Sequence, residues 1–401
     1  MVLKIIKIMT PISLLLCVTL FAQNTILVSK LTDANNAFGF KLFSALISQD
    51  EIKNISISPA SITIALAMTY NGADLATKDS MAQTLNITNL SLNEFNQANY
   101  TLRNLLTNKK RKALVKIANS LWADRTIKFK KEFIATNKKY YNAQLTELNF
   151  SDPKSAKIIN NWVSKATDNK IQKIIEDIGE DVVAFIINAI YFKGIWHNKF
   201  DKNQTTEQPF YTIDGKEKKQ PMMKQKGTYN YLETDKFQAV SLPYTNHEMS
   251  LYIFLPKETS EIKQFLSHLN FENWQKWLSE FRLHKGTIAI PKFKLEYEKS
   301  LKEALSTIGM AIAFDDNRAN FSKMASTQVK GNIFIGDVKH KTYIEVNEEG
   351  TEAAAVTVVQ IEVKAAPIDE FTMIVDHPFF YAIVDNQTNA VLFMGVVVEP
   401  E

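Results

Sequence analysis

The chain has 401 residues, of which 45% are hydrophobic and 22% are charged, the composition of an ordinary globular protein. Its formal net charge of +4 is too small to indicate nucleic-acid binding, and we expect none. The only cysteine is Cys17, near the N-terminus. If that segment is removed, the mature protein has no disulfide, no cysteine-ligated zinc and no cysteine nucleophile.

The first residues have the layout of a secretory signal peptide. Lys4 and Lys7 precede an apolar run over 12–21, and the small residue Ala22 suits a cleavage site. We expect residues 1–22 to be removed and the protein to be secreted, or to reach the periplasm or envelope if it is bacterial. Two alternatives stay open. One is a membrane anchor, for which the run is short, and the other is a lipid on Cys17, for which the preceding Leu16 is large.

Helical periodicity dominates the first part of the chain after this segment. Apolar side chains recur every three or four residues, and Pro59 suits the start of a helix. The predicted helices cover 34–46, 61–70, 93–106 and 155–166, and one strand is predicted at 115–122.

From Val182 onward the sequence favours strands, beginning with the almost wholly apolar run VVAFIINAIYF. Later strands are predicted at 239–244, 250–256 and 287–297, a helix at 300–310, and two strands around a turn at 385–389. Because helices come first and strands later without regular alternation, we expect an α+β fold with an antiparallel or mixed sheet. No linker-like segment divides the chain, so residues 23–401 are expected to form one domain.

Motifs of catalysis and cofactor binding do not occur in the sequence. It contains no G-x-S-x-G, H-E-x-x-H, P-loop or G-x-G-x-x-G motif, and no two of the six histidines have zinc-ligand spacing. Adjacent acids such as Glu348 and Glu349 are most simply solvated surface. We therefore expect no enzyme activity, no cofactor and no metal, and a secreted hydrolase is the disfavoured alternative.

A basic run follows the predicted helix 93–106. It consists of Lys109, Lys110, Arg111 and Lys112, and further lysines stand at 128, 130 and 131. Such a run can bind a polyanion by releasing counterions. The alternative is a solvated turn and helix face.

The segment from Ala353 to Ile361 contains no charge, glycine or proline, and much of it is β-branched. Gly350 precedes this segment. The residues after it include Lys364-Ala365-Ala366-Pro367, a sequence typical of an exposed, cleavable loop. A permanently exposed segment of this kind would be an aggregation hazard. Every second residue would share one face of a strand, and these residues are small at the leading end: Thr351, Ala353, Ala355, Thr357, Val359 and Ile361. The segment is either a permanent core strand or a loop that later becomes a strand.

Five segments in order resemble the serpins, the serine protease inhibitors, across the mature chain. They are NISISPASITIALAMTYNGA, NAIYFKGIW, QPMMKQKG, HKTYIEVNEEGTEAAA and DHPFFYAIVDNQTNAVLFMGVVVEP. The resemblance implies an α+β serpin fold. Such a fold has a large mixed sheet surrounded by helices, two further sheets and an exposed reactive-centre loop, here at about 350–371.

The resemblance also implies a mechanism. A trypsin-like protease would attack the Lys364–Ala365 bond, since Lys364 stands fourteen positions after Gly350. The freed loop would then insert into the main sheet and trap the acyl-enzyme. The implied partner is a serine protease, held covalently by a monomeric inhibitor. An elastase-like enzyme that cuts a neighbouring bond stays open, as does a non-inhibitory serpin that carries a ligand and is cleaved without trapping.

Three groups of site residues are implied by the same resemblance. The hinge, where the loop begins to insert, comprises Glu348, Gly350, Thr351, Glu352, Ala353, Ala354 and Ala355. The shutter, which holds the sheet closed, comprises Ser58, Ser61, Asn188 and His340. The breach, where insertion begins, comprises Trp196, Lys292 and Glu348, with an ion pair expected between the last two.

Overall fold

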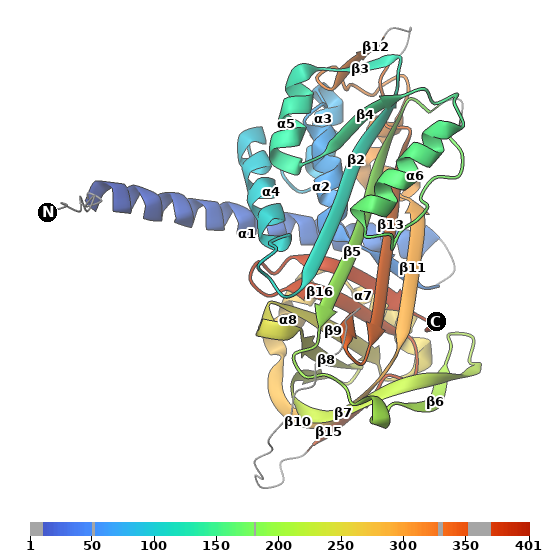
Figure 1. Ribbon diagram of the computed structural model, residues 1–401. Coiled ribbons are helices and arrows are strands. Elements are labelled where there is room, and N and C mark those ends of the chain that lie inside the picture. The colour runs from blue at the N-terminus through green and yellow to red at the C-terminus, as the bar shows by residue number, and fades with distance from the viewer. Residues whose placement is uncertain (1–10, 50–52, 180–181, 328–331, 352–369) are drawn as a thin grey trace, which may run out of the picture.

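The structure is a computed structural model that describes residues 11–49, 53–179, 182–327, 332–351 and 370–401, with side chains described from residue 24 onward except for Ser260. Over these ranges the α-helices are α1 (Pro11–Gln49), α2 (Pro59–Tyr70), α3 (Leu75–Thr84), α4 (Leu92–Leu106), α5 (Lys131–Tyr141), α6 (Lys154–Ala166), α7 (Ile262–His268), α8 (Phe271–Glu280) and α9 (Lys302–Leu305). The N-terminal part of α1 projects away from the body (Figure 1). None of the helices searched is both long and apolar enough to cross a membrane.

The helices begin where their sequences provide caps. The Ser58 hydroxyl caps α2 and Pro59 occupies its first turn, while Ser91 and Glu94 form a reciprocal capping box at α4. Every residue of α2 is buried, so this helix is enclosed on all sides. The four helices predicted in the first part of the chain are confirmed within α1, α2, α4 and α6.

A six-stranded mixed sheet forms the upper half of the body (Figure 1). Its strands, in spatial order, are β11 (Phe293–Ser300), β13 (Asp337–Asn347), β14 (Gly350–Thr351), β5 (Ala184–Ile195), β2 (Leu114–Asp124) and β4 (Gln144–Leu148). One face is covered by α6, whose Trp162 packs edge-on against Trp122 of β2, and α2 lies against β2 and β5 on the core side. The nearly unbroken burial of β5 follows from this coverage of both faces.

A nine-stranded sheet forms most of the lower half. Its main path is β1 (Ile55–Ile57), β17 (Val391–Val397), β16 (Phe379–Asp385), β9 (Met249–Pro256), β8 (Phe237–Pro243), β7 (Glu217–Glu233), β10 (Arg282–Pro291) and β15 (Phe371–Ile374), and β6 (Thr206–Tyr211) pairs with β7. A third, two-stranded sheet joins β12 (Ala325–Thr327) to β3 (Ile127–Phe129). The expected α+β architecture with one large mixed sheet and two further sheets is confirmed.

Two predicted elements differ from the structure. The strand predicted at 287–297 is divided between β10 and β11, which belong to different sheets. Between them the Lys292 amide still donates to Pro221 O, in register with the β10–β7 ladder, and from Phe293 onward the chain pairs with β13 of the other sheet. The helix predicted at 300–310 ends its α-helical part at Leu305, and Gly309 has a φ of +125°, which an α-helix does not allow.

Candidate functional site

The hinge begins inside the six-stranded sheet rather than outside it. After β13 the chain turns at Glu348 and Glu349 and returns as β14, in which Thr351 pairs with Val346 of β13 on one side and Gly194 of β5 on the other. The expectation of an exposed loop starting at about residue 350 is therefore wrong for its first two residues. The reason is that the tight turn after β13 delivers them directly between two strands.

Gly350 is required at this turn. Its φ is +144°, and a Cβ at this position would lie 2.1 Å from Gly194 O of β5. Any other residue would be strained and would also collide with backbone, which cannot move aside. The glycine thus allows the chain to pass close to β5 and enter the sheet.

Thr351 is anchored by the Tyr244 side chain, which stacks on Trp196. It is fully buried, and its hydroxyl lies 2.7 Å from the Tyr244 hydroxyl. Burial raises the pKa of Tyr244, so this group stays a neutral phenol. The Tyr244 ring stacks on Trp196 with centroids 4.5 Å apart, and Trp196 Nε1 donates to Asn347 O at 2.8 Å. The breach residue Trp196 therefore contacts both the hinge turn and the side chain that holds Thr351.

Ion pairs fix the two acids of the turn. Lys292 Nζ lies 3.1 Å from Glu348 Oε2, the pair anticipated from sequence, and the Thr205 hydroxyl donates to Glu348 Oε1 at 2.9 Å. Burial tends to raise the pKa of Glu348, but these partners and a backbone amide lower it below its ordinary value. Glu349 lies 2.6 Å from Lys199 Nζ, which lowers its pKa. The reading of these acids as solvated surface is wrong, because each is largely covered and paired.

The four shutter residues meet at the centre of the sheet. His340 of β13 faces Asn188 of β5 in the parallel ladder, and both are fully buried beneath the N-terminus of α2. The Ser58 amide donates to His340 Nε2 at 3.2 Å, and His340 Nδ1 lies 2.6 Å from Asn188 Oδ1. Since Nε2 accepts, Nδ1 carries the proton. Asn188 Nδ2 donates to the Ser61 hydroxyl, which completes a buried network across two strands and a helix.

Comparison with known proteins decides the family. The family model described as Serpin (serine protease inhibitor) matches residues 33–400. The chain belongs to the serpin family. Serpin B6 from Macaca fascicularis is 34% identical over 375 residues, covering 91% of this chain and 98% of the relative.

Two solved serpins illustrate the range of ligands among proteins of this fold. Native protease nexin-1, solved with heparin, has a TM-score of 0.83 and 29% identity, covering 93% of this chain and 100% of that one. Human thyroxine-binding globulin, solved with thyroxine, has a TM-score of 0.85 and 26% identity, covering 93% of this chain and 99% of that one.

The basic run of this serpin is smaller than its sequence indicates. The Arg111 side chain is nearly buried and forms an ion pair with the fully buried Asp385, and it also donates to Gln387 at 2.7 Å. Arg111 therefore serves to hold the β16–β17 turn. Lys109, Lys110 and Lys112 are exposed.

Two residues of the site were missed from sequence. Asn119 of β2 accepts a hydrogen bond from Asn188 Nδ2, and Tyr244 contacts Thr351. An asparagine within a buried strand was a usable signal, whereas nothing in the sequence around Tyr244 relates it to the hinge. The predicted residues Glu352, Ala353, Ala354, Ala355, Lys364 and Ala365 lie outside the described residues.

His340 makes the stability of this serpin depend on pH. Burial lowers its pKa to about 3, from an ordinary value of about 6.5. Between these values the unfolded chain binds a proton that the folded chain does not. The stabilising contribution of the neutral His340 to the free energy of unfolding is complete above about pH 6.5 and is lost as the pH falls toward 3.

We expect His340→Gln to lower the free energy of unfolding at pH 7.5 and to flatten its dependence on pH. The difference in free energy of unfolding between wild type and His340→Gln should shrink by about 1.4 kcal/mol per pH unit below pH 6. Urea unfolding at pH 7.5, 6.5, 5.5 and 4.5 measures this, with the exposed His284→Gln as the control. Parallel pH profiles for wild type and His340→Gln would show that His340 is not buried in its neutral form.

Tyr244→Phe should loosen the hinge, because it leaves the buried Thr351 hydroxyl without its partner at a cost of about 1–3 kcal/mol. Hydrogen exchange of the peptide covering β14 should accelerate. Adding Thr351→Val removes the orphaned hydroxyl as well and should restore much of the protection. If the single variant exchanges like wild type, the contact does not anchor the hinge.

Proposed function

We propose that this serpin is an irreversible suicide-substrate inhibitor of serine proteases, with a preference for trypsin-like enzymes. The protease attacks Lys364, forms an acyl-enzyme, and is carried away when the cut loop inserts into the six-stranded sheet. The observation that carries the proposal is β14, which already separates β13 from β5 at one end of the sheet. Insertion then extends an existing strand and does not have to start a new one.

The strand pairings supply a driving force for insertion. Beyond β14, Asp337–Tyr343 of β13 pairs directly with Phe185–Tyr191 of β5 in a parallel ladder. An inserted strand would replace this single ladder by two antiparallel ladders, because β14 runs antiparallel to both neighbours. Antiparallel pairing is slightly more stable per residue than parallel pairing, and the number of strand pairs would rise.

Continuation of the β14 register predicts where each loop residue arrives. Thr351 pairs with Val346 and Gly194, so an unbroken antiparallel ladder would put Thr357 between His340 and Asn188. A threonine hydroxyl can both donate and accept there, which allows it to replace part of the shutter network that insertion disrupts. The other residues on this face, Ala353, Ala355, Val359 and Ile361, would bury no charge.

Trapping requires that insertion is faster than hydrolysis of the acyl-enzyme. Fourteen residues of strand span roughly 45 Å, so complete insertion would move the attached protease by about that distance. Such a pull on the acyl linkage would distort the catalytic geometry, to which rates are highly sensitive.

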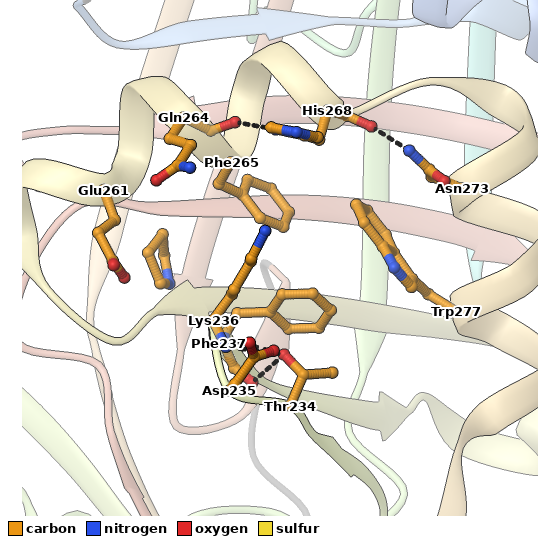
Figure 2. A pocket seen from close by; sticks show the side chains of 11 residues that line it. Thr234, Asp235, Lys236, Phe237, Glu261, Gln264, Phe265, His268, Asn273 and Trp277 are labelled. Carbon is orange, nitrogen blue, oxygen red and sulfur yellow. Dashed lines mark hydrogen bonds between the residues drawn. The ribbon is translucent and has the colours of Figure 1, made fainter.

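A non-inhibitory carrier is the second candidate, supported by the likeness to thyroxine-binding globulin and by a pocket. The pocket has a volume of about 270 Å³. Phe237, Phe265 and Trp277 are among the residues that line it (Figure 2). Phe265 and Trp277 are stacked with centroids 5.5 Å apart, and Lys236 reaches toward the rings. A covalent complex with a protease that survives boiling in detergent distinguishes inhibition from carriage.

Two further proposals concern the location of the protein and the binding of a polyanion. We propose that residues 1–22 direct secretion, which N-terminal sequencing of the exported protein would test. We also propose that Lys109, Lys110 and Lys112 bind a sulfated polyanion. The heparin present with protease nexin-1 supports this, and salt-dependent retention on heparin would test it.

Lys364→Ala should greatly weaken the inhibition of trypsin, because the acidic group in the protease pocket loses its partner. Lys364→Arg is the matched control and should still inhibit trypsin, while elastase-like enzymes should be affected less by either change. Association rates and mass spectrometry of the released C-terminal peptide measure the effect. Trapping of trypsin by Lys364→Ala at the wild-type rate would mean that the cleaved bond lies elsewhere.

Thr351→Arg should convert the inhibitor into a substrate. Residue 351 is already buried in the sheet next to Tyr244, so an unpaired charge there should expel β14 from the sheet. Insertion after cleavage would then have to bury this charge, at a cost of several kcal/mol. A step slowed by about 1.4 kcal/mol runs tenfold slower, whereas deacylation is unchanged. Cleavage should therefore release active trypsin. Thr307→Arg, at an exposed threonine, is the control and should trap normally.

Gel analysis and thermal unfolding before and after cleavage complete this test. Wild type should form a complex and melt at a higher temperature once cleaved, because the inserted loop becomes a hydrogen-bonded strand. If wild type and Thr351→Arg are both cleaved without a complex, and cleavage leaves both melting temperatures unchanged, the carrier function takes the place of inhibition.

A further inference from the structure

Two histidines lie in contact beside the breach. The ring centroids of His197 and His247 are 4.1 Å apart and the ring planes are inclined by 49°. His197 directly follows the breach residue Trp196, whereas His247 belongs to the turn between β8 and β9. Segments fifty positions apart in the sequence thus bring two imidazoles together at the surface.

Neither imidazole is engaged by the protein. Over the described residues no hydrogen bond or ion pair involves either ring, and both residues are exposed. By contrast, the rings of His268, His340 and His377 each lie within hydrogen-bonding distance of a protein oxygen. The pair therefore offers ring nitrogens that no structural role uses.

The backbone holds the pair in place. The His197 amide donates to Pro243 O, and the His247 amide donates to Tyr244 O, both at 2.9 Å. The His247 carbonyl in turn accepts from the Asn386 side chain.

We propose that His197 and His247 form a binding site for a divalent transition-metal ion of the class that imidazoles prefer, such as Zn²⁺. Among the residues searched, no group of three or more potential ligands is found, so water would complete the coordination. The site would bind more weakly than structural zinc sites with four protein ligands. Mg²⁺ and Ca²⁺ favour oxygen ligands and should not bind.

A metal at this position would stabilise the anchor of the hinge. The turn that carries His247 begins directly after Tyr244, and within it the Thr245 hydroxyl donates to Ile195 O at the end of β5. Bridging the two histidines would add a second link between this turn and the end of β5. Because Tyr244, which immediately precedes this turn, holds Thr351, the metal would make detachment of the hinge rarer.

Zinc binding is tested by titrating ZnCl₂ into untagged, EDTA-treated and desalted protein at pH 7.5 in a calorimeter. Wild type should bind one Zn²⁺ per chain. His197→Gln and His247→Gln should each weaken binding at least tenfold, and the exposed His284→Gln should match wild type. No binding by wild type, or equal binding by all variants, would overturn the site.

Coupling to the hinge is tested by hydrogen exchange of the peptide covering β14. At a zinc concentration about ten times the dissociation constant, opening that breaks the site should become roughly tenfold rarer. The protection should be absent in His247→Gln and with MgCl₂. Zinc binding without any change in exchange would overturn the coupling.

Discussion

The direct parallel pairing of β13 with β5 is the constraint on which the rest of this structure depends. It ends at Tyr343 and Tyr191, and beyond that point β14 separates the two strands. A new strand can enter the interior of a sheet only where an existing ladder opens, and here the opening has begun at one end. The turn at Glu348 and Glu349, with its lysine partners, fixes the point from which further opening would proceed.

The buried polar network lies where the remaining ladder must break. Apolar side chains at positions 188 and 340 would hold the strands by packing alone, and packing does not depend on one exact arrangement. Hydrogen bonds among Asn188, His340 and Ser58 are satisfied in only one register. The network therefore specifies the closed sheet, and a hydroxyl arriving on an inserted strand can take over part of it. Hydrogen-bonding side chains can thus both fix the register of the closed sheet and exchange their partners when a strand enters.

The sequence predicted the fold class, the main helices and the grouping of the shutter residues, because periodicity and family motifs are local patterns. It could not predict that β14 is already paired, since that depends on how a two-residue turn places Gly350 against β5. It could not relate Tyr244 to Thr351, which are 107 positions apart. The basic run has fewer exposed cations than the sequence indicates, because Arg111 is buried in an ion pair with Asp385, which is far away in the sequence.

The fold alone does not decide between an inhibitor and a carrier, because thyroxine-binding globulin shares it with a TM-score of 0.85. The decision rests on whether a segment can enter between β13 and β5 at least as fast as water reaches the acyl-enzyme. Entry requires side chains that pass between strands and stay buried without a charge. From Ala353 to Ile361 the sequence offers alanine, valine, threonine, isoleucine and one glutamine, the last on the outward face. A carrier needs no such sequence, and this composition therefore favours inhibition.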